Sequence, residues 1–180
     1  MAADQELVFS KKVMEMITVS NEFCLFLKEH ERYEVMQILA YMERILPLLY
    51  LKASLLPALD VSDEGADERF VTEEEWETLF QELKTQLGKA DTFFCNITAG
   101  DQELKKFSLA EQLADIYQDL KDFLTLYQRN TMAARENAVN NCRELFQNRW
   151  GPAALRALFA IHHFLYGTAD AGMYPGYHNN

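Results

Sequence analysis

The sequence predicts an all-α protein, a single-domain bundle of five or six helices. Apolar side chains recur three or four positions apart through most of the chain. At 100° per residue such side chains share one stripe of a helix, and the stripe is buried against other helices. The chain has 180 residues, 49% of them hydrophobic, which suits one domain with a continuous core. The clearest stripe consists of Val35, Ile38, Leu39, Met42, Ile45, Leu46, Leu49, Ala53 and Leu56.

Caps and helix breakers set the expected boundaries. Thr72 and Ser108 each stand three positions before a glutamate, the capping-box pattern that satisfies backbone donors at a helix start. Gly88 fits a helix C-terminus. Gly151-Pro152 is expected to break the chain and to open a new helix with the proline in its first turn. The expected helices cover residues 5–30, 33–56, 72–88, 108–129, 131–148 and 152–166.

Three segments show no helical pattern. Residues 57–71 form an acidic loop containing Gly65 and are the best candidate for disorder. Residues 89–107 are ambiguous, because DTFFCNI is β-prone but short and AGDQ is typical of a turn. Residues 168–180 have no periodicity and are expected to form a loosely ordered tail, which leaves residues 1–167 as the helical domain.

Pro47 lies inside the helix expected over residues 33–56. Proline lacks an N–H and clashes with the preceding turn, so we expect a kink at this position. The bend would let the apolar stripe follow a curved core. Leu46 and Leu49 should then be buried, and Leu48 or Leu51 should be less buried.

The chain is acidic, with 17 basic residues, 28 acidic residues and a net charge of −11. Phosphate backbones repel such a chain, so we expect no nucleic-acid partner. Nine acidic residues and one base, Arg69, lie between Asp60 and Glu77, so this stretch carries −8. A solvated loop followed by an acid-rich first helical turn explains the pattern, and a docking patch for a basic partner is the alternative.

Cysteine usage and the N-terminus favour a cytoplasmic protein. Cys24, Cys95 and Cys142 form neither a CxxC pair nor an even disulfide framework, and their apolar surroundings suit free thiols in a reducing compartment. The N-terminal MAADQELVFSKK lacks the apolar core of a signal peptide. The longest apolar run, Ile45–Leu51, is too short to span a bilayer, so we expect no membrane partner.

No motif for a metal, a cofactor or a nucleotide stands in the sequence. Metal sites of helical bundles usually use Glu-x-x-His, but the residues three before the four histidines are Leu27, Phe159, Ala160 and Pro175. HExxH, GxSxG, Walker A and GxGxxG are absent. Glu74 and Glu77 lack the second acidic pair with which all-α pyrophosphohydrolases hold magnesium. We therefore expect no metal and no cofactor, whereas a catalytic triad assembled from distant residues stays open.

Four carboxylates occur on the helix expected over residues 108–129, namely Glu111, Asp115, Asp119 and Asp122. At helical spacing Asp115 and Asp122 point away from the apolar face, and Asp119 lies at its flank. The simplest interpretation is a solvated face.

Two arginines, Arg135 and Arg149, fall on the apolar stripe of the helix expected over residues 131–148 and just beyond it. Charged groups on a buried stripe need partners. Asp119 is the expected partner of at least one of them. A structural ion pair is the first interpretation, and an anion-binding role is the alternative.

His162 shares a predicted core face with Leu155, Leu158, Leu165 and Tyr166. A buried, hydrogen-bonded histidine is the first interpretation, and a role in proton transfer is the alternative. His163 is turned about 100° away and is expected to be exposed.

Three segments resemble a bacterial family of uncharacterised proteins, the domain of unknown function number 5063. The stretch LADIYQDLK at residues 113–121 resembles that family's ADIYxDLK signature. Trp150-Gly151 followed by LRAL at residues 155–158, and LPLLYLKASLLP at residues 46–57, resemble further segments of it. The resemblance implies an all-helical protein without an assigned activity.

The leading functional hypothesis is a non-enzymatic protein-interaction or scaffolding module, because an acidic surface and many helix faces occur without a catalytic set. The alternative is a small-ligand-binding protein or an enzyme. Its polar pocket would lie between the helices expected over residues 108–129, 131–148 and 152–166. The candidate site residues are Asp115, Tyr117, Asp119, Arg149, Arg156 and His162.

Overall fold

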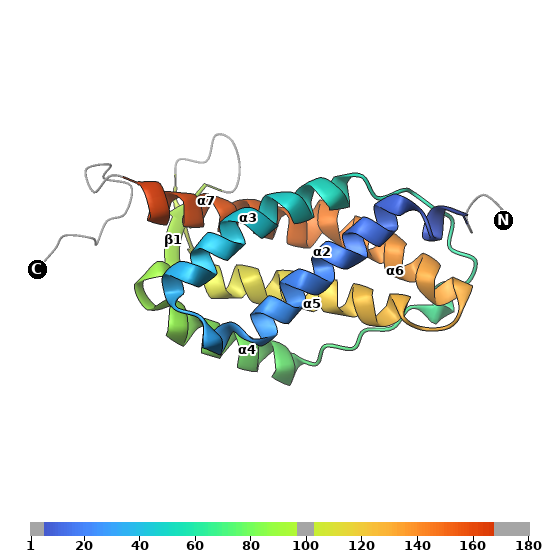
Figure 1. Ribbon diagram of the computed structural model, residues 1–180, viewed down its shortest axis with the longest axis horizontal. Helices are drawn as coiled ribbons and strands as arrows, with labels where there is room; N and C mark the ends of the chain where they lie inside the picture. Colours follow the sequence, from blue (N-terminus) through green and yellow to red (C-terminus); the bar gives the residue numbers. More distant parts are fainter. Residues whose placement is uncertain (1–5, 97–102, 168–180) are drawn as a thin grey trace, which may run out of the picture.

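Helix α5 (Leu109–Tyr127) lies at the centre of the structure, a computed structural model that describes residues 6–96 and 103–167. Four helices pack directly on α5, and α3 packs on α2 and α7 (Figure 1). The other long helices are α2 (Lys11–Lys28), α3 (Val35–Ser54), α4 (Glu73–Leu87), α6 (Met132–Leu145) and α7 (Gly151–Tyr166). The predicted all-α bundle is confirmed, and none of the helices described is long and apolar enough to cross a membrane.

The start of α5 is fixed by two polar side chains. The Ser108 hydroxyl accepts a hydrogen bond from the Glu111 backbone N–H at 3.2 Å, as the capping pattern predicts. The buried Asp91 carboxylate accepts from the Ser108 hydroxyl at 2.7 Å and from the Ala110 backbone N–H at 2.8 Å. Asp91 therefore satisfies a further donor of the first turn, a role that the sequence pattern does not reveal.

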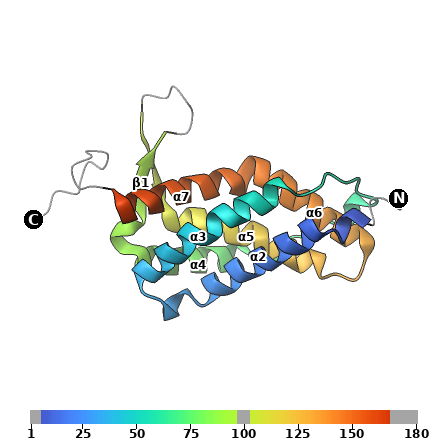
Figure 2. The same cartoon turned by 45° about the horizontal axis from the view of Figure 1, so that its top comes forward.

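A two-stranded antiparallel sheet fills part of the ambiguous segment 89–107. Strand β1 (Thr92–Cys95) pairs with β2 (Lys105–Ser108), and the rings of Phe93 and Phe107 stack with centroids 5.6 Å apart. Figure 2 shows this hairpin standing at one end of the bundle beside α7. The predicted turn AGDQ lies outside the described residues.

The first two helices differ in detail from the expected ranges. The helix expected over residues 5–30 is interrupted before Lys11, and α2 ends at Lys28, before a 3₁₀ turn at His30–Arg32. Helix α3 continues through Pro47 as one element. Leu46 and Leu49 are buried, whereas Leu48 and Leu51 are exposed, as predicted. The kink at Pro47 stays a prediction.

The predicted break at Gly151-Pro152 is wrong. Helix α6 leads into a π-helical turn, Phe146–Trp150, and directly on into α7. The Gly151 N–H donates to the Phe146 carbonyl, five residues back, so the helical ladder widens instead of stopping. Pro152 stands in the first turn of α7, where its missing N–H is tolerated.

The buried face of α7 consists of small residues, which corrects the predicted core face. Alanines and one isoleucine are buried there, whereas Leu155 and Tyr166 are exposed and Leu158 and Leu165 are only partly covered. Small side chains let α7 approach its neighbours closely, so the larger apolar residues are displaced to the rims. The buried residues are Gly151, Ala153, Ala154, Ala157, Ala160 and Ile161.

Substitution of Gly151 by alanine is expected to lower the free energy of unfolding by about 1–3 kcal/mol, the usual cost of overpacking. A Cβ atom at this position would overlap the Phe146 carbonyl oxygen and press on the Phe146 ring. Urea denaturation followed by circular dichroism measures the change. Gly65→Ala is the control, because its Cβ would meet only the Asp63 side chain. Equal stabilities of Gly151→Ala and the parent would contradict this account of the π turn.

Candidate functional site

The acidic loop 57–71 is tied to α6, which differs from the expected disorder. Glu136 accepts a hydrogen bond from the Ser62 backbone N–H at 2.9 Å. Asn137 donates to the Asp63 carbonyl oxygen at 2.7 Å. Asn141 donates to the Asp67 carboxylate at 2.6 Å. Polar side chains of α6 thus hold the loop in place, in addition to the apolar contacts that Leu59 and Phe70 make with the core.

The loop ends in a cluster of charges on α5, which we call the Arg–Asp cluster. Its central carboxylate, Asp119, has no exposed side-chain surface and lies between two guanidinium groups. Arg69 from the loop is 3.0 Å from Asp119 Oδ1, and Arg149 from the π turn is 3.1 Å from the same oxygen. The predicted pair of Asp119 with Arg149 is confirmed. The cluster comprises Arg69, Asp115, Asp119, Asp122 and Arg149.

Asp122 is buried, so its predicted place on a solvated face is wrong. Its Oδ1 accepts hydrogen bonds from the backbone N–H groups of Phe70 and Val71, both at 2.8 Å. Its Oδ2 is 2.7 Å from Arg69 Nε. The loop covers the side of α5 that lies opposite the apolar face, and the carboxylate satisfies the backbone donors that arrive with it.

Burial dominates the ionisation of Asp119. Desolvation raises the pKa of this carboxyl above its usual value, and it outweighs Arg149 and Arg69, which act in the opposite direction. The neighbouring Asp115 carboxylate also raises the pKa. Asp119 Oδ2 is buried without a hydrogen-bond partner among the described residues. Ionised Asp119 therefore carries an unfavourable desolvation free energy, which the two arginines offset only in part.

The structure brings three of the six candidate site residues together and separates the rest. Asp115 and Asp119 share Arg149, which lies 3.7 Å from Asp115, and Asp115 also accepts from the Trp76 indole at 3.0 Å. Arg156 instead donates to Gln112 at 2.7 Å and lies over the Phe107 ring.

His162 does not lie in the core. It is exposed, whereas His163 is partly covered and contacts the Phe159 ring edge-on. Both predictions for this pair are therefore reversed, because the alanine face rather than the leucine face of α7 is buried. The proposed convergence of six polar groups between α5, α6 and α7 is not what the structure contains.

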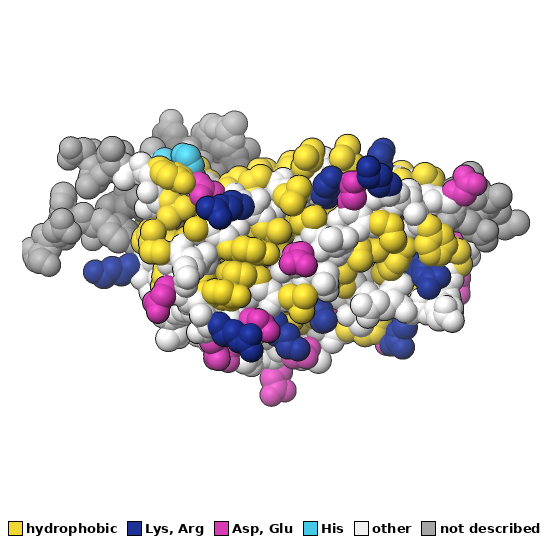
Figure 3. Space-filling model, in the orientation of Figure 1, with side chains coloured by type: hydrophobic (Ala, Val, Ile, Leu, Met, Phe, Trp, Pro, Cys, Tyr) yellow, Lys and Arg dark blue, Asp and Glu magenta, His cyan; other side chains and the backbone are white. Residues whose placement is uncertain are grey.

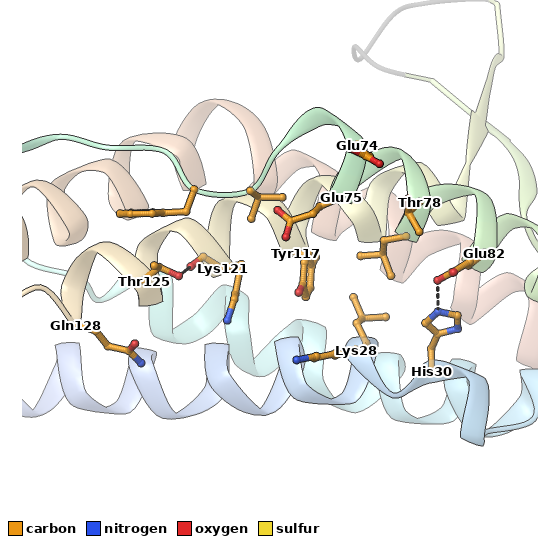
Figure 4. A pocket seen from close by; sticks show the side chains of 14 residues that line it. Lys28, His30, Glu74, Glu75, Thr78, Glu82, Tyr117, Lys121, Thr125 and Gln128 are labelled. Atoms are coloured by element: carbon orange, nitrogen blue, oxygen red, sulfur yellow. Dashed lines mark hydrogen bonds and ion pairs between the residues drawn. The ribbon is translucent and has the colours of Figure 1, made fainter.

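The remaining candidate, Tyr117, lines a hollow between α2, α4 and α5 (Figure 4). This hollow, the α2–α4–α5 groove, has a volume of about 720 Å³, which is in the range of small-molecule sites. Its lining on α5 and on the residue that caps this helix runs from Tyr117 to Gln128, a length of roughly 16 Å at 1.5 Å per residue. Buried Leu27 and Leu79 and half-buried Phe70 and Val71 give it an apolar floor.

The polar groups of the groove are separated by sign. Lys28 of α2 and Lys121 of α5 are exposed, and neither forms an ion pair with any described residue. Figure 4 shows Tyr117 and Lys121 projecting from α5 toward α2, with Lys28 lying beneath them. Glu75 approaches from α4, and one of its oxygens caps the helix by accepting from the Thr72 backbone N–H at 3.0 Å.

Tyr117 is held as a neutral hydrogen-bond donor. Desolvation raises the pKa of its hydroxyl above the usual value, and Cys24 and Glu75 raise it further. The hydroxyl makes no hydrogen bond to another described residue. Burial also raises the pKa of the Cys24 thiol to about 12, and Lys121 partly offsets that rise. Tyr117 and Lys121 both line the groove, and both interact electrostatically with the buried Cys24.

One end of the groove is closed by His30. Its Nδ1 is 2.6 Å from Gln86 Oε1, and its Nε2 is 3.4 Å from Glu82 (Figure 4). The Gln86 amide donates to the carbonyl oxygens of His30 and Tyr33 at 3.0 Å and 2.7 Å. These bonds fix the C-terminal half of α4 against the connection between α2 and α3.

The sequence contains a periodic signal for one wall of this groove. Tyr117, Lys121 and Thr125 recur every four residues, and Gln128 follows after three. That spacing places all four on one flank of α5, beside the buried stripe. Lys28 and Glu75 could not be found in this way, because they belong to other helices.

A second hollow, apolar and of about 320 Å³, lies between α3 and α7. Pro47, Tyr50 and Leu51 line one side, and Leu155 and Leu158 line the other. Further hydrophobic side chains gather over α2 and α3 on the face drawn in Figure 3. Leu25 on this pair of helices is 50% exposed, and Met36 is 56% exposed.

Metal ligands do not converge in the described part of the chain. No group of three or more His, Cys, Asp or Glu side chains in residues 6–96 and 103–167 has a geometry that could hold an ion.

Two comparisons relate the chain to known proteins. A family model described as "Domain of unknown function (DUF5063)" matches residues 8–167. The crystal structure of protein BF1032 from Bacteroides fragilis, a Northeast Structural Genomics Consortium target, superposes with a TM-score of 0.82 at 34% sequence identity. The match covers 91% of this chain and 98% of that chain. No curated protein matches the chain.

Replacement of Asp119 by alanine is expected to cost about 2–3 kcal/mol of unfolding free energy. This value lies between the cost of breaking a fully buried ion pair, about 3–5 kcal/mol, and that of an exposed pair, about 0–1 kcal/mol. The two guanidinium groups would lose the carboxylate between them, but Arg69 keeps Asp122 at 2.7 Å and Arg149 keeps Asp115 at 3.7 Å. The arginine side chains are also 43% and 38% exposed and keep part of their hydration. Thermal and urea denaturation measure the loss.

Glu68→Ala is the matched control for that substitution. Glu68 pairs with Arg129 at 3.2 Å, and both side chains are more than half exposed. The control should melt within about one degree of the parent. If Asp119→Ala did the same, the Arg–Asp cluster would have no stabilising role.

The pH dependence of stability should carry the signature of Asp119. Its pKa is raised from 3.8 on folding, so the folded state binds this proton more tightly than the unfolded chain does. Stability contributed by the protonated form is present below about pH 3.8 and is lost as the pH rises through the folded-state pKa. The parent should therefore lose stability relative to Asp119→Asn as the pH rises from 4. A difference that shifts the other way would indicate a lowered pKa.

Proposed function

The chain belongs to the DUF5063 family, and on the geometry above we propose that it is a non-enzymatic binding protein whose ligand occupies the α2–α4–α5 groove. The supporting observation is an apolar floor beneath polar groups of both signs that have free hydrogen-bonding capacity. This combination is typical of small-molecule sites, in which apolar contact gives affinity and a few polar groups give orientation.

The groove is also rigidly framed. The N-terminal side of α4 follows Phe70 and Val71, which Asp122 holds, and the C-terminal side is held by Gln86. Both α2 and α4 pack on α5, so the two walls are fixed to one common helix. A preformed site loses little conformational entropy on binding, which favours affinity.

A tryptophan at Thr78 is expected to block the groove. Thr78 is exposed on α4 and lines the groove, so the larger side chain fills the hollow without entering the core. A library of small amphiphilic molecules and short peptides is screened by saturation-transfer NMR on the parent and on Thr78→Trp. Ligands of the parent should lose at least ten-fold in affinity on Thr78→Trp.

Thr85→Trp is the matched control, because Thr85 is exposed on the same helix and outside the groove. It should keep the affinity of the parent. Ligands that bind Thr78→Trp as well as the parent would place the binding site elsewhere, and a screen without a ligand would contradict the proposal.

A second candidate is the interaction module that the sequence favours, with an amphipathic helix of a partner protein as its occupant. The observation behind it is the apolar hollow between α3 and α7, whose rim residues Leu51 and Leu155 are 53% and 51% exposed. Apolar grooves between helices commonly accept the apolar face of a third helix.

Photo-cross-linking in cells tests this second candidate. A benzoylphenylalanine at Leu51 should cross-link one protein species reproducibly, whereas the same probe at Met14 on α2 should not. Substituting Leu155 by lysine should remove the cross-link, because a charge at the rim cannot be buried against an apolar helix. Equal labelling from both positions would indicate non-specific contact.

A further inference from the structure

Three donors face one another across the α2–α4–α5 groove without partners of their own. The Lys28 and Lys121 ammonium groups form no ion pair, and the Tyr117 hydroxyl forms no hydrogen bond, with any described residue. Figure 4 shows the side chains of Tyr117 and Lys121 pointing to the same side of α5, and Lys28 directly across from them on α2. Two cations and a neutral donor that share one hollow are complementary to a single anionic group.

The surroundings support this assignment. The chain carries −11, yet this part of the groove holds two cations to which no carboxylate in residues 6–96 and 103–167 is paired. Lys121 lines the groove, and Figure 4 shows its side chain directed from α5 toward α2. The half-buried Tyr117 lines the same part of the groove. An anion bound there would be partly removed from water, where its attraction to the ammonium groups is strongest.

The opposite wall limits the charge of the ligand. Glu75 projects into the groove from α4, and Glu74 and Glu82 also line that side. A second anionic group on the ligand would be repelled by these carboxylates. Between the two charged walls the floor offers Leu27, Leu79, Phe70 and Val71, which favour an apolar chain.

Resting on the binding role proposed above, we infer that Lys28, Lys121 and Tyr117 form an anion subsite, and that the ligand is a small amphiphile with one carboxylate or phosphate head and an apolar tail. The head lies between the two ammonium groups, and the tail lies along the floor toward Phe70 and Val71. Both lysine side chains are exposed, so we expect their substitution to leave the fold intact.

The inference is tested by ¹H–¹⁵N NMR titration of the full chain with hexanoate, hexyl phosphate and hexanol. Hexanoate or hexyl phosphate should shift the signals of Lys28, Tyr117 and Lys121 saturably, and hexanol should bind at least ten-fold more weakly. The comparison of hexanoate with hexyl phosphate distinguishes a carboxylate head from a phosphate head. Lys28→Met and Lys121→Met should each weaken the anionic probe at least five-fold.

Lys121→Arg should restore most of the affinity, because it keeps the charge, and Lys12→Met on the outer surface of α2 should leave it unchanged. Hexanol binding as tightly as hexanoate, or anion-induced shifts confined to other surfaces, would overturn the inference. If neither anionic probe binds while the Thr78→Trp comparison still maps a cationic or neutral ligand to the groove, the anion subsite fails and the binding function stands. If neither experiment finds a groove ligand, both proposals fail.

Discussion

The burial of α5 on nearly all sides is the constraint on which the rest of the structure depends. Four helices pack against it, so its polar side chains cannot all reach water and must be satisfied by neighbouring elements. Arg69 and Arg149 pair with Oδ1 of Asp119, and Oδ1 of Asp122 accepts from the backbone of the loop that covers it. A segment that would otherwise be a free acidic linker thereby becomes part of the packed structure.

This constraint also explains which parts of the fold could be predicted from the sequence. The spacing of apolar residues and the capping residues are local properties of the sequence. The helices, the capping box at Thr72 and the N-cap at Ser108 could therefore be predicted from neighbouring residues alone. The pair of Asp119 with Arg149 was also predictable, because a charge on an apolar stripe needs a partner. The burial of Asp122 was not predictable, because it depends on where the loop 57–71 lies.

The errors have similar physical causes. For α7 the largest apolar residues were assigned to the core, but a face of alanines allows closer helix packing and is the buried one, so His162 is exposed. Gly151-Pro152 has the composition of a break, yet a π turn accommodates both residues without one. Of the candidate site, Tyr117 was identified from its own helix, whereas Lys28 and Glu75 belong to helices whose packing no local pattern specifies.

Helix α4 is held by hydrogen bonds at both of its ends. Asp122 holds the chain just before its first turn, and Gln86 holds its last turn, whereas the span between them faces an open groove. Asp122 is buried and Gln86 is partly buried, whereas most side chains that α4 presents to the groove are exposed. The residues that hold α4 in place are therefore different from those that it presents to the groove. If the groove has the binding role proposed above, substitutions along the open span would change its chemistry without loosening the fold.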